Sequence, residues 1–176
     1  MKRIDFKNAF GRLYFPSAKE VAFLEVPEMA FAMVDGLGNP NGNRTYVAAL
    51  ESLFGISYTL KFALKHARVA DYKVAPLESL WWNQEDGGFS VDARNEWKWT
   101  AMIMQPDVVT RGHFDDAVSQ LREKKDPHAL PKLRFERWRE GLSAQILHIG
   151  PYSAEGPTIE RVHAAIRAKG WRLRGK

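Results

Sequence analysis

Apolar and polar positions change their period several times along the chain, and each change indicates a new element. Residues 21–34, VAFLEVPEMAFAMV, are rich in β-branched and aromatic residues and predict a strand. The cluster DGLGNPNGN at 35–43 predicts a turn or loop, because Gly, Asn and Pro interrupt regular structure. From Asn43 onward, apolar residues recur every three or four positions, which predicts one helix of about six turns.

The predicted helix carries a second apolar stripe beside the first. Phe54, Tyr58 and Phe62 follow one another at a spacing of four residues. The two stripes make the helix apolar over a wide arc, so we expect it to be well buried. A buried tyrosine hydroxyl needs a hydrogen-bond partner. Tyr58 is therefore either a residue of the helix-sheet packing or a donor to an oxygen of a ligand.

Two extended segments, 71–83 and 96–105, follow this helix and flank the Asp-Gly-Gly turn signal within residues 84–95. They predict a β-hairpin, so the first part of the chain has the order strand, helix, strand, strand. Residues 107–125 predict a second helix with Thr110 as its N-cap, with acids early and bases late, as the helix dipole favours.

The pattern restarts after the proline-containing stretch 126–133. A short extended run at 133–138 precedes a predicted strand at 141–150. The turn PYSAEGP then leads into a helix with Pro157 near its first position and Gly170 just past its end. This strand, loop and helix repeat the order of the first part, which indicates an internal duplication.

Composition narrows the class of protein. With 176 residues, of which 45% are apolar, the chain is long enough for a substantial core. It has no cysteine, which excludes disulfides, thiolate catalysis and Cys-ligated zinc, and favours the cytoplasm. There is no signal-peptide pattern and no apolar run of about eighteen residues, so neither export nor a membrane span is predicted. The chain has a net charge of +5, but its basic residues form no dense motif, which argues against nucleic acid as a partner.

Four segments carry a resemblance to a known family: VDGLGNPNG at 34–42, ISYTLKF at 56–62, PLESLWW at 76–82 and HIGPYSAEGPTIERVHAAI at 148–166. Together they are similar to the GyrI-like small-molecule-binding family. They fit its stand-alone branch better than the effector-binding domains of AraC-type or MerR-type transcription regulators. The resemblance covers nearly the whole chain.

The resemblance implies an α+β fold of two strand-helix-strand-strand modules related by pseudo-twofold symmetry. The antiparallel sheets of the modules would form a ligand cleft, with the helices packed behind. Residues 1–176 would then be a single GyrI-like domain, with module one at about 20–106, a linking helix at about 107–125 and module two at about 130–176.

Related sequences continue past the position of Lys176 into a final strand that carries a glutamate and a tyrosine. Module two is therefore expected to lack its closing strand, which leaves an unpaired sheet edge. A shortened chain and a strand supplied by a partner copy, as in a homodimer, are both consistent with this expectation.

The resemblance also implies a function. Family members bind bulky aromatic or lipophilic compounds that are often cationic, so the first hypothesis is a binding protein for drug or toxin sequestration, or for sensing. Some stand-alone members hydrolyse cyclopropane-bearing DNA-alkylating natural products, so a detoxifying hydrolase that adds water is the alternative. Inhibition of DNA gyrase, suggested by the family name alone, is a third.

The acid and two indoles of PLESLWW are the first candidate site residues. Neighbours in a strand point to opposite faces, so one of Trp81 and Trp82 should pack under the helix while the other faces the cleft. Glu78 shares the parity of Trp82 and would lie on the same face. A carboxylate among aromatic rings attracts a lipophilic cation, and desolvation would raise its pKa toward that of a general base. Alternatively, the indoles are core residues and Glu78 is a solvated or salt-bridged edge residue.

Further candidates come from the same alternation. Met102 and Met104 share a face of the second hairpin strand, where thioethers suit an adaptable pocket for flat ligands, or they are ordinary core residues. Tyr152 precedes the last helix, where it either faces the cleft or packs in its turn. In the hydrolase hypothesis Glu78, or the glutamate of the missing strand, orients the water, Tyr58 donates to the developing oxyanion, and an indole stacks on the ligand.

Histidine spacing bears on metals and cofactors. The five histidines show no metal-ligand spacing, and no nucleophile, phosphate-loop or dinucleotide motif is present. We therefore expect neither a metal nor a cofactor.

Overall fold

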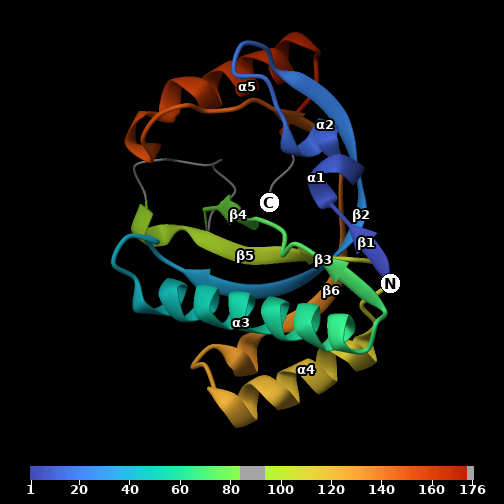
Figure 1. The fold of residues 1–176 in the computed structure, drawn as a ribbon. Helices are drawn as coiled ribbons and strands as arrows, with labels where there is room; N and C mark the ends of the chain where they lie inside the picture. The colour runs from blue at the N-terminus through green and yellow to red at the C-terminus, as the bar shows by residue number, and fades with distance from the viewer. Residues whose placement is uncertain (84–93, 174–176) are drawn as a thin grey trace. The chain divides into compact units, whose positions relative to one another are not determined.

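The computed structural model describes residues 1–83 and 94–173 (Figure 1). It has a mixed α+β fold that divides into two compact units. Among the described residues, unit 1 comprises residues 1–6 and 29–138, and unit 2 comprises residues 7–28 and 139–173. Each unit therefore combines segments that are far apart in the sequence.

The main sheet has the strand order β4-β5-β2-β6. Its strands are β4 (Leu77–Trp82), β5 (Lys98–Gln105), β2 (Ala22–Leu37) and β6 (Arg134–Gln145). Strand β5 lies between β4 and β2 and is antiparallel to both. The predicted hairpin is confirmed by the β4–β5 pairing, while residues 84–93 of its predicted turn lie outside the described residues.

Helix α3 (Arg44–His66) packs against this sheet, as Figure 1 shows, and it begins where the sequence predicts. The Asn43 side chain accepts hydrogen bonds from the backbone N–H groups of Thr45 and Tyr46, which caps the helix. Its apolar buried residues are Ala49, Leu53, Ile56, Leu60 and Leu64. Leu53, Leu60 and Leu64 recur at the predicted apolar period, because this side of the helix meets the strands.

The second apolar stripe of α3 is not buried as expected. Phe54, Tyr58 and Phe62 are 36%, 46% and 48% exposed. They line a groove between α3 and α4 (Arg111–Lys124), and a 23-residue helix can turn only one side toward the sheet. By length and composition alone, helix α3 could cross a membrane, but a core helix that packs on a sheet meets the same criteria.

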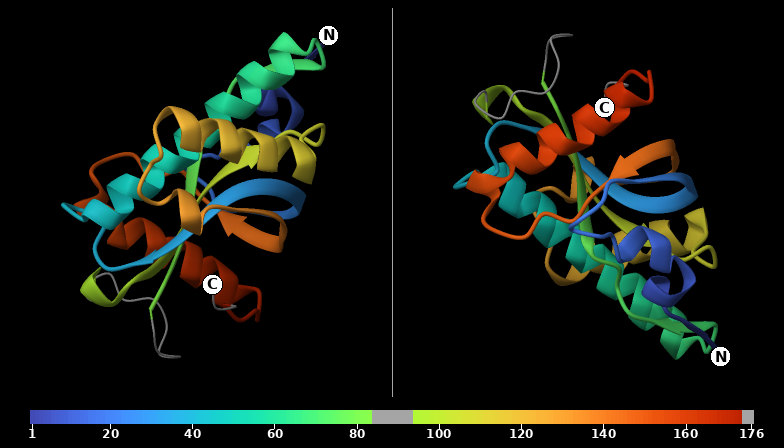
Figure 2. Two further views of the ribbon diagram at one scale, coloured as in Figure 1. Left: turned by 90° about the horizontal axis from the view of Figure 1, so that it is seen from below. Right: turned by 90° about the horizontal axis from the view of Figure 1, so that it is seen from above.

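Helix α4 lies against α3 (Figure 2), and its Phe114 ring also stacks on Phe135 of β6 at 5.2 Å. Thr110 caps it, as predicted, by accepting from the His113 backbone N–H, and the His113 ring accepts from the Thr110 backbone N–H. The expected early acids are absent from the first turn, whereas Arg122 and Lys124 lie in the last turn. After α4, the short helix η2 (Leu130–Lys132) leads into β6.

The first extended segment of the hairpin is shorter than predicted. Residues 71–83 contain two strands, because β3 (Ala70–Tyr72) ends before β4 begins. β3 pairs in parallel with β1 (Lys2–Ile4) in a separate two-stranded sheet. The sequence showed no element at the N-terminus, where α1 (Phe6–Ala9) and α2 (Gly11–Tyr14) follow β1.

Unit 2 contains the first part of β2, the end of β6, η3 (Tyr152–Ala154) and α5 (Gly156–Ala168). The predicted segments 133–138 and 141–150 join in one strand, β6, which ends at Gln145, so residues 146–150 lie outside it; Gly141 within the strand has a φ of +78°. The end signals of α5 are confirmed: Pro157 lies in its first turn and Gly170 follows its cap with a φ of +70°. Residues 171–173 form no strand, and the pseudo-twofold relation of the modules stays a prediction.

Candidate functional site

Strand register assigns the tryptophans of unit 1 to faces. Trp81 lies opposite Trp99 across β4 and β5, so the two indoles share a face. The Tyr46 ring of α3 lies 5.8 Å from the Trp81 ring and 4.9 Å from the Trp99 ring, so this face is turned toward the helix. Trp82 lies on the opposite face by strand alternation. The prediction that one of the adjacent indoles packs under the helix is therefore confirmed, and that indole is Trp81.

The face that is turned away from α3 is called the far face below. Across β4, β5 and β2 it consists of three rows of opposed residues: Glu78, Met102 and Met33; Leu80, Thr100 and Asp35; Trp82, Lys98 and Leu37. The exposure of the side chains rises from the first row to the third, since Met102 in the first row is 3% exposed whereas Leu37 in the third row is 56% exposed. A ligand therefore has access at the end formed by the third row.

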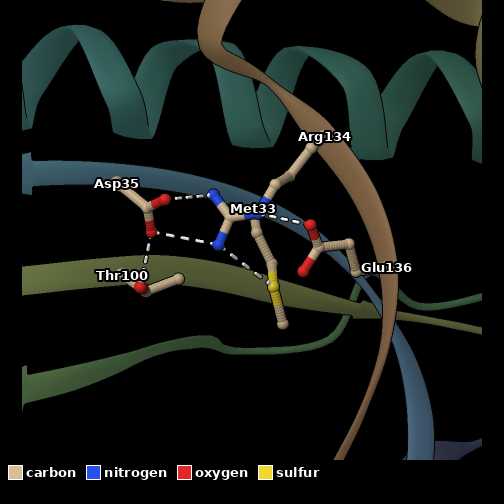
Figure 3. Close-up of polar contacts among 5 residues, drawn as sticks. All are labelled: Met33, Asp35, Thr100, Arg134 and Glu136. Atoms are coloured by element: carbon tan, nitrogen blue, oxygen red, sulfur yellow. Dashed lines mark hydrogen bonds and ion pairs between the residues drawn. The ribbon is translucent and has the colours of Figure 1, made fainter. Parts of the chain in front are cut away.

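A polar cluster lies on the far face beside that accessible end (Figure 3). Arg134 of β6 donates from Nη1 to Oδ2 of Asp35 at 2.7 Å and from Nη2 to Oδ1 at 3.0 Å. The Thr100 hydroxyl of β5 donates to Oδ1 of Asp35 at 2.6 Å. Both carboxylate oxygens of Asp35 are thus held by donors, and a two-pronged guanidinium contact compensates its charge.

Two further contacts fix the Arg134 side chain, which is 29% exposed. Its Nε lies 2.9 Å from Oε1 of Glu136, and its Nη2 lies 3.7 Å from the sulfur of Met33. As Figure 3 shows, Arg134 of β6 contacts Asp35 and Met33 of β2, and Asp35 in turn contacts Thr100 of β5, so this chain of contacts links three strands. Such a contact gives the first residues of β6 a defined position beside the accessible end of the far face.

A pocket of about 670 Å³ opens at the accessible end of the far face. It is lined by Asp35, Gly36, Leu37, Thr45, Trp82, Lys98, Trp99 and Lys132. Its volume lies within the range of small-molecule sites. An indole and aliphatic carbons offer stacking surface there, and two ammonium groups offer hydrogen-bond donors. No group of three or more potential metal-binding His, Asp or Glu residues occurs in the described part of the chain.

Glycine at position 36 allows this pocket to form as it does. A Cβ atom on Gly36 would lie 2.1 Å from Cζ2 of the Trp99 ring. The Trp99 indole thus packs directly on the backbone of β2, where it is completely buried. Only a residue without a side chain leaves this space for the ring.

Of the predicted site residues in unit 1, only Trp82 lines the pocket. Glu78 lies on the same face and the same strand, two rows away from Trp82. Met102 and Met104 share this face as predicted, but they are 3% and 2% exposed and do not line the pocket. They are packing residues of the sheet in this structure, because the first row is covered.

The structure does not bring Tyr58 together with Glu78. Tyr58 lies in the groove between α3 and α4, which has a volume of about 810 Å³. Its ring stacks on Phe62 at 6.3 Å, and α3 separates this groove from the sheet. Tyr152 belongs to unit 2, where its side chain is 86% exposed in η3.

Sequence reasoning missed the charged residues of this end of the far face. Asp35 fell in the predicted loop at 35–43, although β2 continues to Leu37 and alternates Met33, Asp35 and Leu37 on one face. Lys98 alternates in the same way with Thr100 along β5, so strand alternation in the sequence could have placed Lys98 on this face. Arg134 gave no such signal, because its contact with Asp35 depends on the position of β6.

Solved structures with similar folds relate the chain to other proteins. A crystal structure of an uncharacterized conserved protein from Listeria innocua has a TM-score of 0.88 and 32% sequence identity, over 98% of this chain and 87% of that chain. A crystal structure of a hydrolase from Listeria innocua has a TM-score of 0.83 and 32% identity, over 98% and 90% of the two chains.

Another crystal structure of a hydrolase from Listeria innocua has a TM-score of 0.84 and 35% identity, over 96% of this chain and 82% of that chain. No protein-family model and no curated protein matches the chain. Sequence identity above 30% over most of both chains accompanies a shared fold in each of these comparisons. The chain therefore belongs to the same protein family as these proteins from Listeria innocua.

Proposed function

We propose that this protein is a GyrI-like binding protein for bulky aromatic or lipophilic small molecules, serving in their sequestration or sensing. The observation that carries the proposal is the pocket of about 670 Å³, where the indole of Trp82 lies beside Leu37 and Lys98. Flat ligands stack on indole rings, and aliphatic side chains add apolar contact. The resemblance of residues 76–82 and 148–166 to the GyrI-like family supports the same function.

Titration with a flat aromatic compound such as 2-naphthol tests the proposal. We expect quenching of tryptophan fluorescence, and we expect Trp82→Leu to weaken binding about tenfold, because it removes the stacking surface. Trp171→Leu is the matched control, since this indole lies in unit 2 and outside the pocket. Equal affinities of the two variants would mean that the pocket is not the binding site.

Hydrolysis of the bound compound is a second candidate function. Two of the family relatives from Listeria innocua are named hydrolases, which favours it. The substrate class would be cyclopropane-bearing alkylators in which the ring is conjugated to a dienone. Water attacks the strained methylene carbon, a C–C bond of the ring breaks, and its electron pair moves to the carbonyl oxygen. That oxygen takes up the proton from the water, so the product is the phenol with one added water.

The roles of residues in this reaction follow from their positions. Trp82 would align the flat substrate. Glu78 lies on the same face, two rows from Trp82 and outside the pocket lining, so it would orient the water for a substrate that extends past Leu80 along this face. Tyr58 has no role because it lies between α3 and α4. Asp35 is already held by Arg134 and Thr100, so it would act through its charge rather than as the base.

Mass spectrometry of a cyclopropanoid alkylator incubated with the protein tests this candidate. We expect more water-addition product than protein, and a rate lowered about a hundredfold by Glu78→Gln. The Tyr58→Phe variant is the control and should retain the wild-type rate. Binding without any product above the no-protein background would leave the sequestering function alone.

A further inference from the structure

The charges around the pocket indicate which ligands it prefers. Its ionisable lining side chains are Asp35, Lys98 and Lys132. Asp35 is paired with Arg134, which also contacts Glu136. Among the described residues, three cationic and two anionic side chains are therefore gathered here, which leaves one positive charge in excess within this set. The resemblance to GyrI-like proteins implies ligands that are often cationic, whereas this excess favours the opposite sign.

The negative charge near the pocket is directed away from a ligand. Both oxygens of Asp35 accept from Arg134, and Oδ1 also accepts from Thr100. A carboxylate with its lone pairs occupied in this way offers little to a second cation. A cationic ligand would have to displace the guanidinium, whose two hydrogen bonds are shorter than 3.1 Å.

The positive charge, in contrast, is available to a ligand. Within the described residues, no ion pair or hydrogen bond engages the ammonium group of Lys98 or Lys132. Lys98 lies between Trp82 and Leu37 in the third row of the far face, so its ammonium group belongs beside the stacking surface. Thr45, in the first turn of α3, adds a hydroxyl and the positive end of the helix dipole.

We propose that this pocket selects flat aromatic ligands that carry a carbonyl or anionic oxygen over ligands of the same shape that carry a cation. Lys98 and Lys132 donate charge-assisted hydrogen bonds to that oxygen while the ring stacks on Trp82. The inference rests on the proposed binding function. In the hydrolase reaction the same ammonium groups face the oxygen on which negative charge develops, where fixed positive charge lowers the barrier most.

Calorimetric titration with two matched probes tests this selectivity. The probes are 2-naphthoate and 2-naphthyltrimethylammonium, which share a ring system and differ in the sign of their charge. We expect the wild-type protein to bind the carboxylate at least tenfold more tightly. Lys98→Met should remove most of this preference by weakening the carboxylate alone, and Lys98→Arg should retain it. Lys132→Met should weaken the carboxylate by a smaller factor, because Lys132 is exposed.

Controls separate this inference from the proposed function. Lys73→Met removes a lysine that does not line the pocket and should leave both affinities unchanged. Thermal unfolding of each variant checks that it is folded. If Lys98→Met does not fold, Lys132→Met replaces it as the test of the charge preference. If the cationic probe binds more tightly and its binding depends on Trp82, the proposed charge selectivity is wrong, while the pocket remains the proposed binding site. If neither probe binds in a manner that depends on Trp82, the proposed function fails, and the selectivity fails with it.

Discussion

Single residues of unit 1 carry structural roles that their chemistry alone would not reveal. Gly36 has no side chain, and the Trp99 ring occupies the space that a side chain would need. Trp99 is completely buried between β2, β4 and α3, where it also meets Tyr46. It cannot move aside without opening the core, because protein interiors are close-packed.

We predict that Gly36→Ala destabilises the protein by about 1–3 kcal/mol, the usual cost of overpacking a core. Urea unfolding followed by circular dichroism measures the change in the free energy of unfolding. Gly112→Ala is the matched control, since a Cβ there lies 3.8 Å from the nearest atom, Oγ1 of Thr110. It should be neutral or slightly stabilising. Equal losses in the two variants would contradict the contact argument.

Tyr72 is a buried residue whose polar atom has no partner. Its side chain is 4% exposed and packs against Phe6, and its hydroxyl has no hydrogen bond within the described residues. Burial raises the pKa of the Tyr72 hydroxyl well above its usual range, because the charged form is poorly solvated. The hydroxyl group therefore costs stability rather than adding it.

We predict that Tyr72→Phe is more stable than the wild type by about 1 kcal/mol at neutral pH. The folded-state pKa is raised, so the wild type loses stability as the pH rises above about 10, where the unfolded tyrosine ionises first. The advantage of Tyr72→Phe should widen there. Urea unfolding at neutral and alkaline pH measures both effects, with the half-exposed Tyr58→Phe as a control that changes neither. A constant difference across pH would contradict the pKa argument.

At the scale of elements, Asn43 joins a strand to a helix. Its side-chain oxygen accepts from the backbone N–H groups of Thr45 and Tyr46, and its Nδ2 donates to the backbone oxygen of Leu37 at 3.0 Å. One side chain thus caps α3 and holds the end of β2, and both of these elements line the pocket. The loop between them is positioned by this pair of interactions.

We predict that Asn43→Ala lowers the free energy of unfolding by about 1–2 kcal/mol, because it removes the cap. Asn43→Asp keeps the acceptor and loses only the donor to Leu37, so it should lose less than half as much. Thermal and urea unfolding of the two variants measure the difference. If Asn43→Asp were as unstable as Asn43→Ala, the bond to Leu37 rather than the cap would be the main contribution.

At the scale of the whole molecule, the net charge of +5 acts on any charged ligand before contact. We predict that association with 2-naphthoate slows several-fold between about 0.02 M and 0.3 M salt, since added ions screen the attraction. Stopped-flow fluorescence measures the rate. The cationic probe 2-naphthyltrimethylammonium should show the reverse trend. An identical salt dependence of the two probes would mean that the net charge has no steering effect.

Several features of the fold were predictable because they are local. The start of α3 at Asn43 and of α4 at Thr110 follows from cap residues before an apolar period. The opposite faces of Trp81 and Trp82 follow from strand alternation, which needs no knowledge of the partner strand. The prediction that the stripe of Phe54, Tyr58 and Phe62 is buried was wrong, because apolar periodicity does not say which side of a helix meets the sheet.

Thus the sequence by itself determined the main helices, the hairpin and the parity of Glu78 and Trp82, since these depend on the backbone of neighbouring residues. Only the tertiary structure decided that Asp35, Thr100 and Arg134 meet, because they come from three strands whose register no local pattern encodes. The tertiary structure also decided that Trp82 and Lys98 line one pocket, whereas Tyr58 lies in a different groove. Packing between distant segments, not residue type, sets which side chains share a site.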